Sequence, residues 1–288
     1  MAKKKQVTVA DNQSTFSFDV NKFENFNATV NELRTGIYAP IEKISTNSIT
    51  FKNFIQNRKR RSILSSWGEV HVIGNILTQT HRDLLDCILS VSDQPVALKD
   101  GRVAYYFKLS DVSKEYAKNS KNNYTWIKEK LQEMQTTAIE FKAKDSNSFV
   151  SFSILEKVAF SESYDSYGIV FSSDYRQYVE QNLTVNYQQE LSKLLKVDSA
   201  LLKAIIRFFW THKHCNISIH QVLISIGYPT ESDRAIRTAK KEIKDNAEIL
   251  EKEFGIFYNK KENFLYTQTN ENINFISPSS NPLTSLEN

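Results

Sequence analysis

Residues 227–246, GYPTESDRAIRTAKKEIKDN, are the most informative segment of the sequence for predicting the structure. Gly227 and Pro229 are residues that end helices, and they follow an apolar segment that begins at Ser218. Thr230 and Asp233 have the spacing of a capping box, which predicts a second helix over residues 231–247. Two helices joined by so short a turn are typical of a helix-turn-helix.

The segments on either side extend this motif into a larger unit. A strongly apolar helix precedes the turn, and two short strands, 255–258 and 264–267, follow it. The loop between these strands carries Lys260 and Lys261. Helices followed by a β-hairpin are the element order of a winged helix. We therefore expect a winged-helix domain over residues 183–275, with the two lysines at the tip of its wing, and expect it to be the main DNA reader.

An earlier part of the chain repeats this order of elements without repeating the residues. A helix capped by Thr80 comes first, and Asp100 and Gly101 form a hairpin turn after it. The expected elements that follow are helices over 111–118 and after Asn122, and strands over 138–141, 149–160 and 167–171. The sequence thus predicts an α+β fold with two tandem winged-helix domains, the first over residues 62–182.

The basic residues concentrate near the N-terminus. Residues 1–61 hold 11 Lys and Arg against 5 Asp and Glu, within a chain whose net charge is only +4. We predict a flexible, partly disordered basic arm over 1–61 and a disordered tail over 276–288. A run of four cations in the arm is expected to contact phosphates, because each neutralised phosphate releases a condensed counterion. The run is Arg58, Lys59, Arg60 and Arg61, and a solvated segment that touches nothing is the alternative.

A helical wheel divides the predicted helix at 231–247 into two faces. Ile236, Ala239 and Ile243 fall on one face, which must pack on the preceding helices. The other face suits the major groove, since Arg can bond guanine twice and Thr can touch a thymine methyl. Its residues are Arg234, Thr238, Lys241 and Asp245, with Arg237 and Lys244 on one shoulder, and its cations and Thr238 are expected to contact DNA. The rival interpretation is a solvated helix held by two ion pairs at i,i+4 spacing, Asp233–Arg237 and Lys241–Asp245.

Two further groups complete the predicted DNA interface. Lys260 and Lys261 on the wing are expected to meet phosphates, which position the protein without specifying sequence. In the first unit, the helix after Asn122 is expected to expose Tyr124 and Lys128. These two side chains either contact a second groove or are simply solvated.

The glycines argue against nucleotide-dependent enzymes. None of the seven has the spacing of a phosphate loop or a dinucleotide fingerprint. His81-Arg82-Asp83 imitates a kinase catalytic loop but lacks the metal-binding Asn that should follow, and it is better interpreted as the first turn of a helix. A cluster late in the chain matches no standard zinc motif; it consists of His212, His214, Cys215 and His220. We therefore expect a protein that is not an enzyme, with no cofactor and no metal.

The distribution of apolar residues also bears on location. No run approaches 18 apolar residues, and the N-terminus lacks the apolar region of a secretory signal. The two cysteines give no sign of an oxidising compartment. We expect a cytoplasmic protein without a membrane partner.

Four stretches resemble the iteron-binding initiators of plasmid replication. They are NILTQTHRDLLDCIL at 75–89, LTVNYQQEL at 183–191, VDSALLKAIIRFF at 197–209 and the helix at 234–246, which ends in KKEIKDN. Together they lie within about 200 residues. One departure is the Phe208-Phe209-Trp210 cluster, which stands in a shifted position relative to the family's usual aromatic residue.

The resemblance implies a function that composition and spacing do not. It implies binding to direct repeats (iterons) at a plasmid origin as double-stranded DNA, opening of an adjacent AT-rich segment, and recruitment of the host replication initiator and replicative helicase. It also implies a homodimer, formed through the first winged helix, that represses its own gene and so contributes to copy control. A winged-helix transcriptional regulator without a replication role is the alternative, and a module that binds only proteins is a third possibility.

Overall fold

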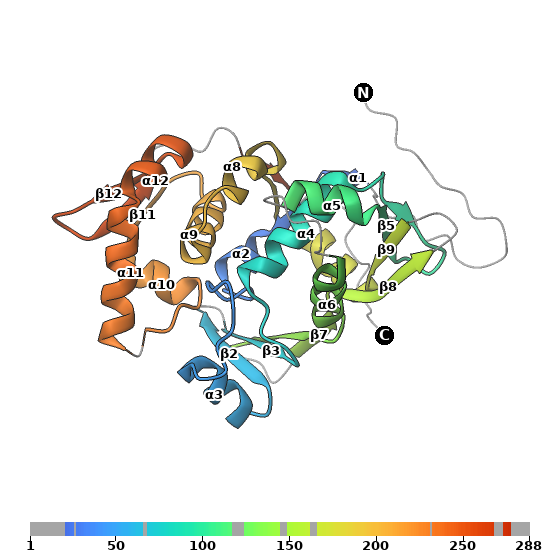
Figure 1. Ribbon diagram of the computed structural model, residues 1–288, viewed down its shortest axis with the longest axis horizontal. Coiled ribbons are helices and arrows are strands. Elements are labelled where there is room, and N and C mark those ends of the chain that lie inside the picture. Colours follow the sequence, from blue (N-terminus) through green and yellow to red (C-terminus); the bar gives the residue numbers. More distant parts are fainter. Residues whose placement is uncertain are drawn as a thin grey trace, which may run out of the picture.

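The computed structural model describes residues 21–25, 27–65, 68–116, 124–144, 149–161, 166–230, 232–267 and 273–277. Within these ranges the chain has a mixed α+β fold (Figure 1). Two large hydrophobic cores, one in each half, and a small third cluster of Ala39, Phe54 and Ile76 lie inside it. None of the described helices has the length and the apolar run needed to cross a bilayer.

The second half has the element order of a winged helix. Its three strands pair in the order β11-β13-β12, so the last strand lies between the other two. Helices pack on this sheet and close the core around α9 and α10. The elements are α9 (Ala200–Trp210), β11 (Cys215–Ser218), α10 (Ile219–Ser225), α11 (Asp233–Asp245), α12 (Ala247–Phe254), β12 (Ile256–Asn259) and β13 (Phe264–Thr267).

Short polar side chains set where these helices begin. Ser218 caps α10 by accepting the N–H of Gln221, and Ser232 caps α11 by accepting the N–H of Ala235. The predicted cap at Thr230 is therefore wrong by two residues, since α11 starts at Asp233. Gly227 adopts a φ of +67° after α10, as a residue that ends a helix in the left-handed region should.

The first half repeats the same arrangement. Three of its strands pair in the order β5-β9-β8, which corresponds to β11-β13-β12, and β4 adds an edge strand beside β5. The expectation of two winged-helix units is thus confirmed by strand order as well as by helix order. The elements are α4 (Gln79–Val91), β4 (Val96–Ala97), β5 (Val103–Phe107), α5 (Leu109–Tyr116), α6 (Tyr124–Gln135), β8 (Leu155–Ser161), β9 (Ser166–Phe171) and α7 (Ser173–Gln181).

Two boundaries in this half differ from the prediction. Thr78 caps α4 and Thr80 lies in its first turn, because His81 at the third helical position returns a bond to the Thr78 backbone. The expected single strand 149–160 is split into β7 (Phe149–Ser153) and β8, which belong to different sheets. The hairpin of β6 (Ala138–Ala143) and β7 is inserted between α6 and β8.

The inserted hairpin pairs with an earlier part of the chain. β2 (Arg60–Ser65) and β3 (Gly68–Ile73) complete a four-stranded antiparallel sheet of order β2-β3-β6-β7. Its inner face buries Ile63, Val70 and Ile139 against the first core. The sheet therefore fixes the basic run at 58–61 to the first unit.

The predicted arm over residues 1–61 is too long. The chain forms regular elements from residue 21 onward, while the part of the prediction that falls on 1–20 lies outside the described residues. The Thr29 and Glu32 side chains form a capping box that starts the second helix of this segment. Its elements are α1 (Asn21–Glu24), β1 (Ala28–Thr29), α2 (Val30–Arg34) and α3 (Ile49–Gln56).

A small sheet ties together three distant parts of the chain. β1 pairs with β10 (Thr184–Asn186), and β10 pairs with β14 (Asn274–Ile276), both in antiparallel register. The connection after β10 leads through η2 (Gln188–Glu190) and α8 (Leu191–Leu195) to α9. Of the predicted tail at 276–288, Ile276 belongs to β14, and residues 278–288 lie outside the described residues.

The two halves meet where α4 and α9 pack together near the middle of the molecule (Figure 1). Buried charges link these two helices. Arg207 on α9 donates to Asp83 and Asp86 on α4, each at 2.7 Å. Arg82 donates to Asp86 at 2.7 Å, and Lys203 pairs with Asp83. Burial disfavours the charge on both arginines. Asp86 beside Arg82, and Asp83 beside Arg207, outweigh that cost and raise both pKa values. This cluster, formed by Arg82, Asp83, Asp86, Lys203 and Arg207, is called the junction cluster below.

Candidate nucleic-acid interface

Helix α11 lies at the outer side of the second unit and has two clearly different faces (Figure 1). Ala239 and Ile243 are fully buried in the second core, and Ile236 is half-buried. The side chains predicted to enter the major groove are all exposed; they are Arg234, Arg237, Thr238, Lys241 and Lys244. The structure therefore places these five residues on one accessible face of one helix.

The cations of α11 have no anionic partners among the described residues. The pairs Asp233–Arg237 and Lys241–Asp245, expected for a merely solvated helix, do not form. Glu242 instead accepts a hydrogen bond from the Ser199 hydroxyl at the start of α9. The Thr238 hydroxyl donates to the Arg234 carbonyl at 2.9 Å, so its methyl group is the part left for an apolar contact.

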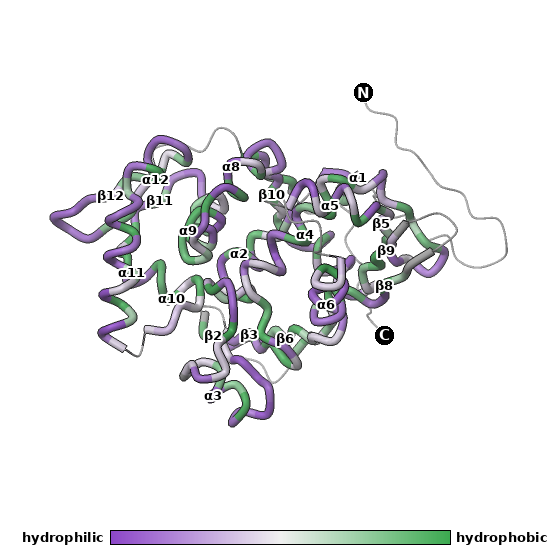
Figure 2. The backbone as a smooth tube through the Cα atoms, in the orientation of Figure 1, coloured by the Kyte–Doolittle hydropathy of each residue, from purple (hydrophilic) through white to green (hydrophobic). Residues whose placement is uncertain are grey.

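The wing between β12 and β13 presents Lys260 and Lys261 in exposed positions. The Asn259 side chain accepts the backbone N–H of Lys261 at 3.1 Å, and Asn263 takes a left-handed φ of +56°, which Asn tolerates better than most residues. These two asparagines hold the tight turn. The tip of this hairpin is hydrophilic (Figure 2).

In the first unit, both predicted residues of α6 are exposed, but only Lys128 lies over a neighbouring aromatic ring. Tyr124 keeps 44% of its surface exposed. Lys128 is exposed as well, with its ammonium 5.3 Å from the centre of the Tyr167 ring on β9. Lys130, by contrast, pairs with Glu133 at 2.7 Å and faces a cleft.

The basic run at 58–61 does not act as a unit. Arg58 and Lys59 are exposed in the turn between α3 and β2, and both adopt left-handed φ angles, of 54° and 57°. Arg60 pairs with Glu140 at 2.8 Å across the sheet. Arg61 points into the molecule and donates to the carbonyls of Gly36 and Gly227. The prediction of four equivalent phosphate contacts is therefore wrong for Arg61, whose guanidinium is occupied inside the protein.

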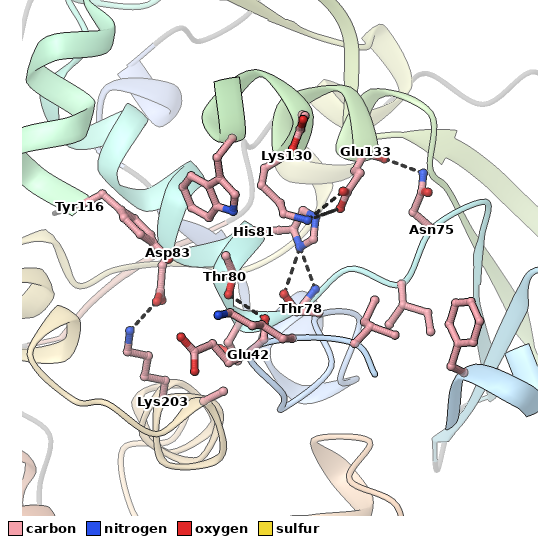
Figure 3. Close-up of a pocket in the computed structure, with 18 of the residues that line it drawn as sticks. Glu42, Asn75, Thr78, Thr80, His81, Asp83, Tyr116, Lys130, Glu133 and Lys203 are labelled. Atoms are coloured by element: carbon pink, nitrogen blue, oxygen red, sulfur yellow. Dashed lines mark hydrogen bonds and ion pairs between the residues drawn. The ribbon is translucent and has the colours of Figure 1, made fainter. Parts of the chain in front are cut away.

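A cleft of about 1140 Å³ lies between the two units, next to the junction cluster (Figure 3). On one wall His81 donates from Nε2 to Glu133 at 2.7 Å and accepts the Thr78 N–H at Nδ1. On another, Lys203 pairs with Asp83. These charged side chains pair with one another, which makes them links between helices. The sequence analysis did not predict these links between helices. It also did not predict the ion pair of Arg82 and Asp86 in the neighbouring junction cluster, although those two residues have the i,i+4 spacing of such a pair.

The His81 side chain should make folding stability depend on pH. Burial lowers the pKa of His81, and the hydrogen bond to Glu133 offsets this only in part. Burial also opposes ionisation of Glu133, but bonds from His81 and Lys130 outweigh it and lower the pKa of Glu133 to about 2. The folded protein thus favours neutral His81, and the unfolded chain binds a proton more readily. The contribution of neutral His81 to the free energy of unfolding is therefore fully present above about pH 6.5, and it is lost as the pH falls below that value.

Urea unfolding between about pH 5.5 and 8 measures this dependence. His81→Gln keeps an acceptor for the Thr78 N–H without a titrating group, so its unfolding free energy should fall less steeply toward acid. The exposed His214 provides the control, and His214→Gln should retain the wild-type slope. Equal slopes for wild type and His81→Gln would show that His81 does not cause the loss of unfolding free energy at acid pH.

Comparison with known proteins gives matches to a family model and to solved structures. Residues 70–205 match the Rep3_N family, described as initiator replication protein, WH1. No curated protein sequence matches the chain. A crystal structure of selenomethionine derivatives of domains 2 and 3 of RctB matches with a TM-score of 0.50 and 9% identity, covering 73% of this chain and 90% of that chain.

A second crystal structure of RctB domains 2–3 matches with a TM-score of 0.43 and 11% identity, over 72% of this chain and 88% of that one. At 9% identity the first match bears on the fold alone. The family match covers the first unit described above and the start of the second, through much of α9. Residues 70–205 are therefore similar to the WH1 domain of initiator replication proteins.

Proposed function

We propose that the protein binds direct repeats (iterons) at a plasmid origin as sequence-specific double-stranded DNA and recruits the host replication initiator and replicative helicase. The observation that carries the first part is the exposed face of α11, where four cations lack anionic partners among the described residues. A helix that buries Ile243 and leaves such a face open has the form of a recognition helix.

The residues of this face suit base reading more than phosphate contact alone. Arg234 and Arg237 have the planar donors that pair with O6 and N7 of guanine. The methyl group of Thr238 matches the methyl group of thymine. Lys260 and Lys261 on the wing would contact the adjacent backbone, as Arg58 and Lys59 would from the first unit.

The decisive test changes Arg234 and Lys241 separately to Ala. The wild-type protein first selects its preferred duplex from a random pool, and competition with single-base variants of that duplex then measures discrimination. Each substitution should weaken binding of the selected duplex by about 1–3 kcal/mol and relax the preference at particular base pairs. Thermal melting should stay close to wild type, because both side chains are exposed.

A lysine far from this face controls for loss of charge. Lys114 on α5 is 81% exposed in its side chain, so Lys114→Ala should leave sequence preference unchanged. If Arg234→Ala and Lys241→Ala both bind the selected duplex with wild-type affinity and preference, α11 does not read DNA. The second unit would then be a protein-binding or structural element.

Replication and transcription roles differ in the DNA that surrounds the gene. An initiator that uses both winged helices needs repeat units of about 20 base pairs, since each recognition helix occupies one major groove per turn of roughly 10 base pairs. Several direct repeats of that length beside an AT-rich segment favour initiation. A single operator without repeats favours the alternative, a winged-helix transcriptional regulator.

A further inference from the structure

Arg61 joins three segments that are far apart in the sequence. It lies in β2 of the first unit, opposite Val72 on β3. Its Nη1 donates to the Gly36 carbonyl at 2.6 Å, and its Nη2 donates to the Gly227 carbonyl at 3.0 Å. Gly36 follows α2, and Gly227 lies in the turn of the helix-turn-helix. One side chain therefore connects the sheet of the first unit to the motif that carries α11.

Gly36 and Gly227, whose carbonyls Arg61 bonds, lie where a larger residue would not fit. Both have left-handed φ angles, +59° at Gly36 and +67° at Gly227. A Cβ atom at Gly36 would lie 2.4 Å from the Ile226 carbonyl oxygen, and one at Gly227 would lie 2.5 Å from Nη2 of Arg61. The loop and the turn thus meet backbone to backbone. Their relative position is fixed more tightly than side-chain packing would require.

The chemistry of Arg61 also favours one arrangement of the units. No carboxylate pairs with it among the described residues, so carbonyl groups alone hold the guanidinium. Burial lowers its pKa to about 10, which leaves it charged at neutral pH. The side chain is half-buried and its bonds go to carbonyls of two separate segments, and a planar fork makes both bonds in only one geometry. Separating the turn from the sheet would leave the charge without these acceptors.

We propose that Arg61 is a positioning residue that sets the separation and angle between α6 and α11, and so lets both units bind one duplex together. This inference rests on the proposed function for its DNA consequence, but not for its structural one. It contrasts Arg61 with Arg58, which stands three positions earlier in the same run and is exposed. Arg58 is therefore the matched control.

The first experiment measures distances in the protein without DNA. Spin labels at Gln132→Cys on α6 and Asp245→Cys on α11 are introduced with Cys215 replaced by Ser; both labelled positions are exposed, and the remaining Cys87 is buried. Double electron–electron resonance should give one narrow distance distribution for wild type and for Arg58→Ala. Arg61→Ala and Arg61→Lys should both broaden or shift it, since a lysine cannot bridge two carbonyls as a fork does.

The second experiment measures binding to the duplex selected by the wild-type protein over a range of salt concentrations. Arg61→Ala should lower affinity roughly tenfold or more, because binding must then order the two units, while the salt slope stays unchanged. Arg58→Ala should reduce that slope by about one. Arg61→Lys should not restore affinity, whereas a lysine would serve well as a phosphate contact.

Unchanged distances in Arg61→Ala, or a lower salt slope that Arg61→Lys restores, would overturn the proposal and make Arg61 a phosphate contact. If Arg61→Ala does not fold, Gly36→Ala decides instead, because its side chain presses on Ile226 and should displace α11 from α6 in the same measurement. Should the wild-type protein select no duplex, the proposed function fails, and the distance measurement still decides the role of Arg61.

Discussion

Replacing Asp86 by Ala is expected to lower the free energy of unfolding by roughly 3–5 kcal/mol. The Asp86 carboxylate is fully buried and accepts bonds from Arg82 and Arg207 at 2.7 Å and from the Tyr187 hydroxyl at 3.0 Å. Its removal leaves the buried charges of Arg82 and Arg207 without one of their carboxylate partners. The resulting loss of stability is expected to be much larger than that from removing a surface ion pair. Chemical denaturation at neutral pH measures the difference.

An exposed aspartate provides the comparison. Asp111 on α5 pairs with Lys114 at 3.7 Å near the surface, and Asp111→Ala should change stability by less than about 1 kcal/mol. Asp86→Asn should fall between the two, because the amide still accepts a bond but carries no charge. A loss below about 1 kcal/mol in Asp86→Ala would mean that the junction cluster contributes specificity without stability.

Replacing Ile243 by Ala is expected to cost about 2–5 kcal/mol of stability through a cavity in the second core. Ile243 is fully buried on α11, while its neighbours Lys241 and Lys244 are exposed. DNA affinity should fall only as far as the folded fraction falls, and base preference should not change. Paired melts and competition binding separate this variant from Arg234→Ala, which should show the reverse behaviour.

Ile249 on α12 is the matched control for this substitution. Its side chain is 46% exposed, so Ile249→Ala removes the same atoms with little loss of packing and should cost less than about 1 kcal/mol. If Ile243→Ala shifted base preference while keeping wild-type stability, the assignment of the two faces of α11 would be reversed.

The faces of α11 could be predicted because a 3.6-residue period is a local property of the sequence. Ala239 and Ile243 recur at that spacing, and both are buried as expected. The start of the helix was harder to place, since Thr230 and Ser232 both carry a hydroxyl that can cap. Only the observed bond from the Ala235 N–H to Ser232 distinguishes them.

The roles of Arg61 and Asp86 could not be predicted, because neither depends on local pattern. A surface ion pair and a buried one have the same i,i+4 spacing, so Arg82–Asp86 gave no sign of its burial. Arg61 stands in a run that suits phosphate contact. Its partners, Gly36 and Gly227, lie on opposite sides of it in the chain and meet only in the folded molecule. Composition can indicate where charged residues cluster in the sequence, but not which of them form bonds inside the folded protein.

The small sheet of β1, β10 and β14 has a consequence for how the chain can be divided. Its central strand is the passage from one winged-helix unit to the other, and its outer strands come from near the two ends of the described chain. The segment that connects the two units is therefore a hydrogen-bonded β-strand and not a flexible linker. Cutting the chain there would strip β10 of a neighbour on one side or the other and expose unpaired backbone groups. Two halves prepared separately should each lack a strand of this sheet, so we expect the two units to fold as one cooperative structure.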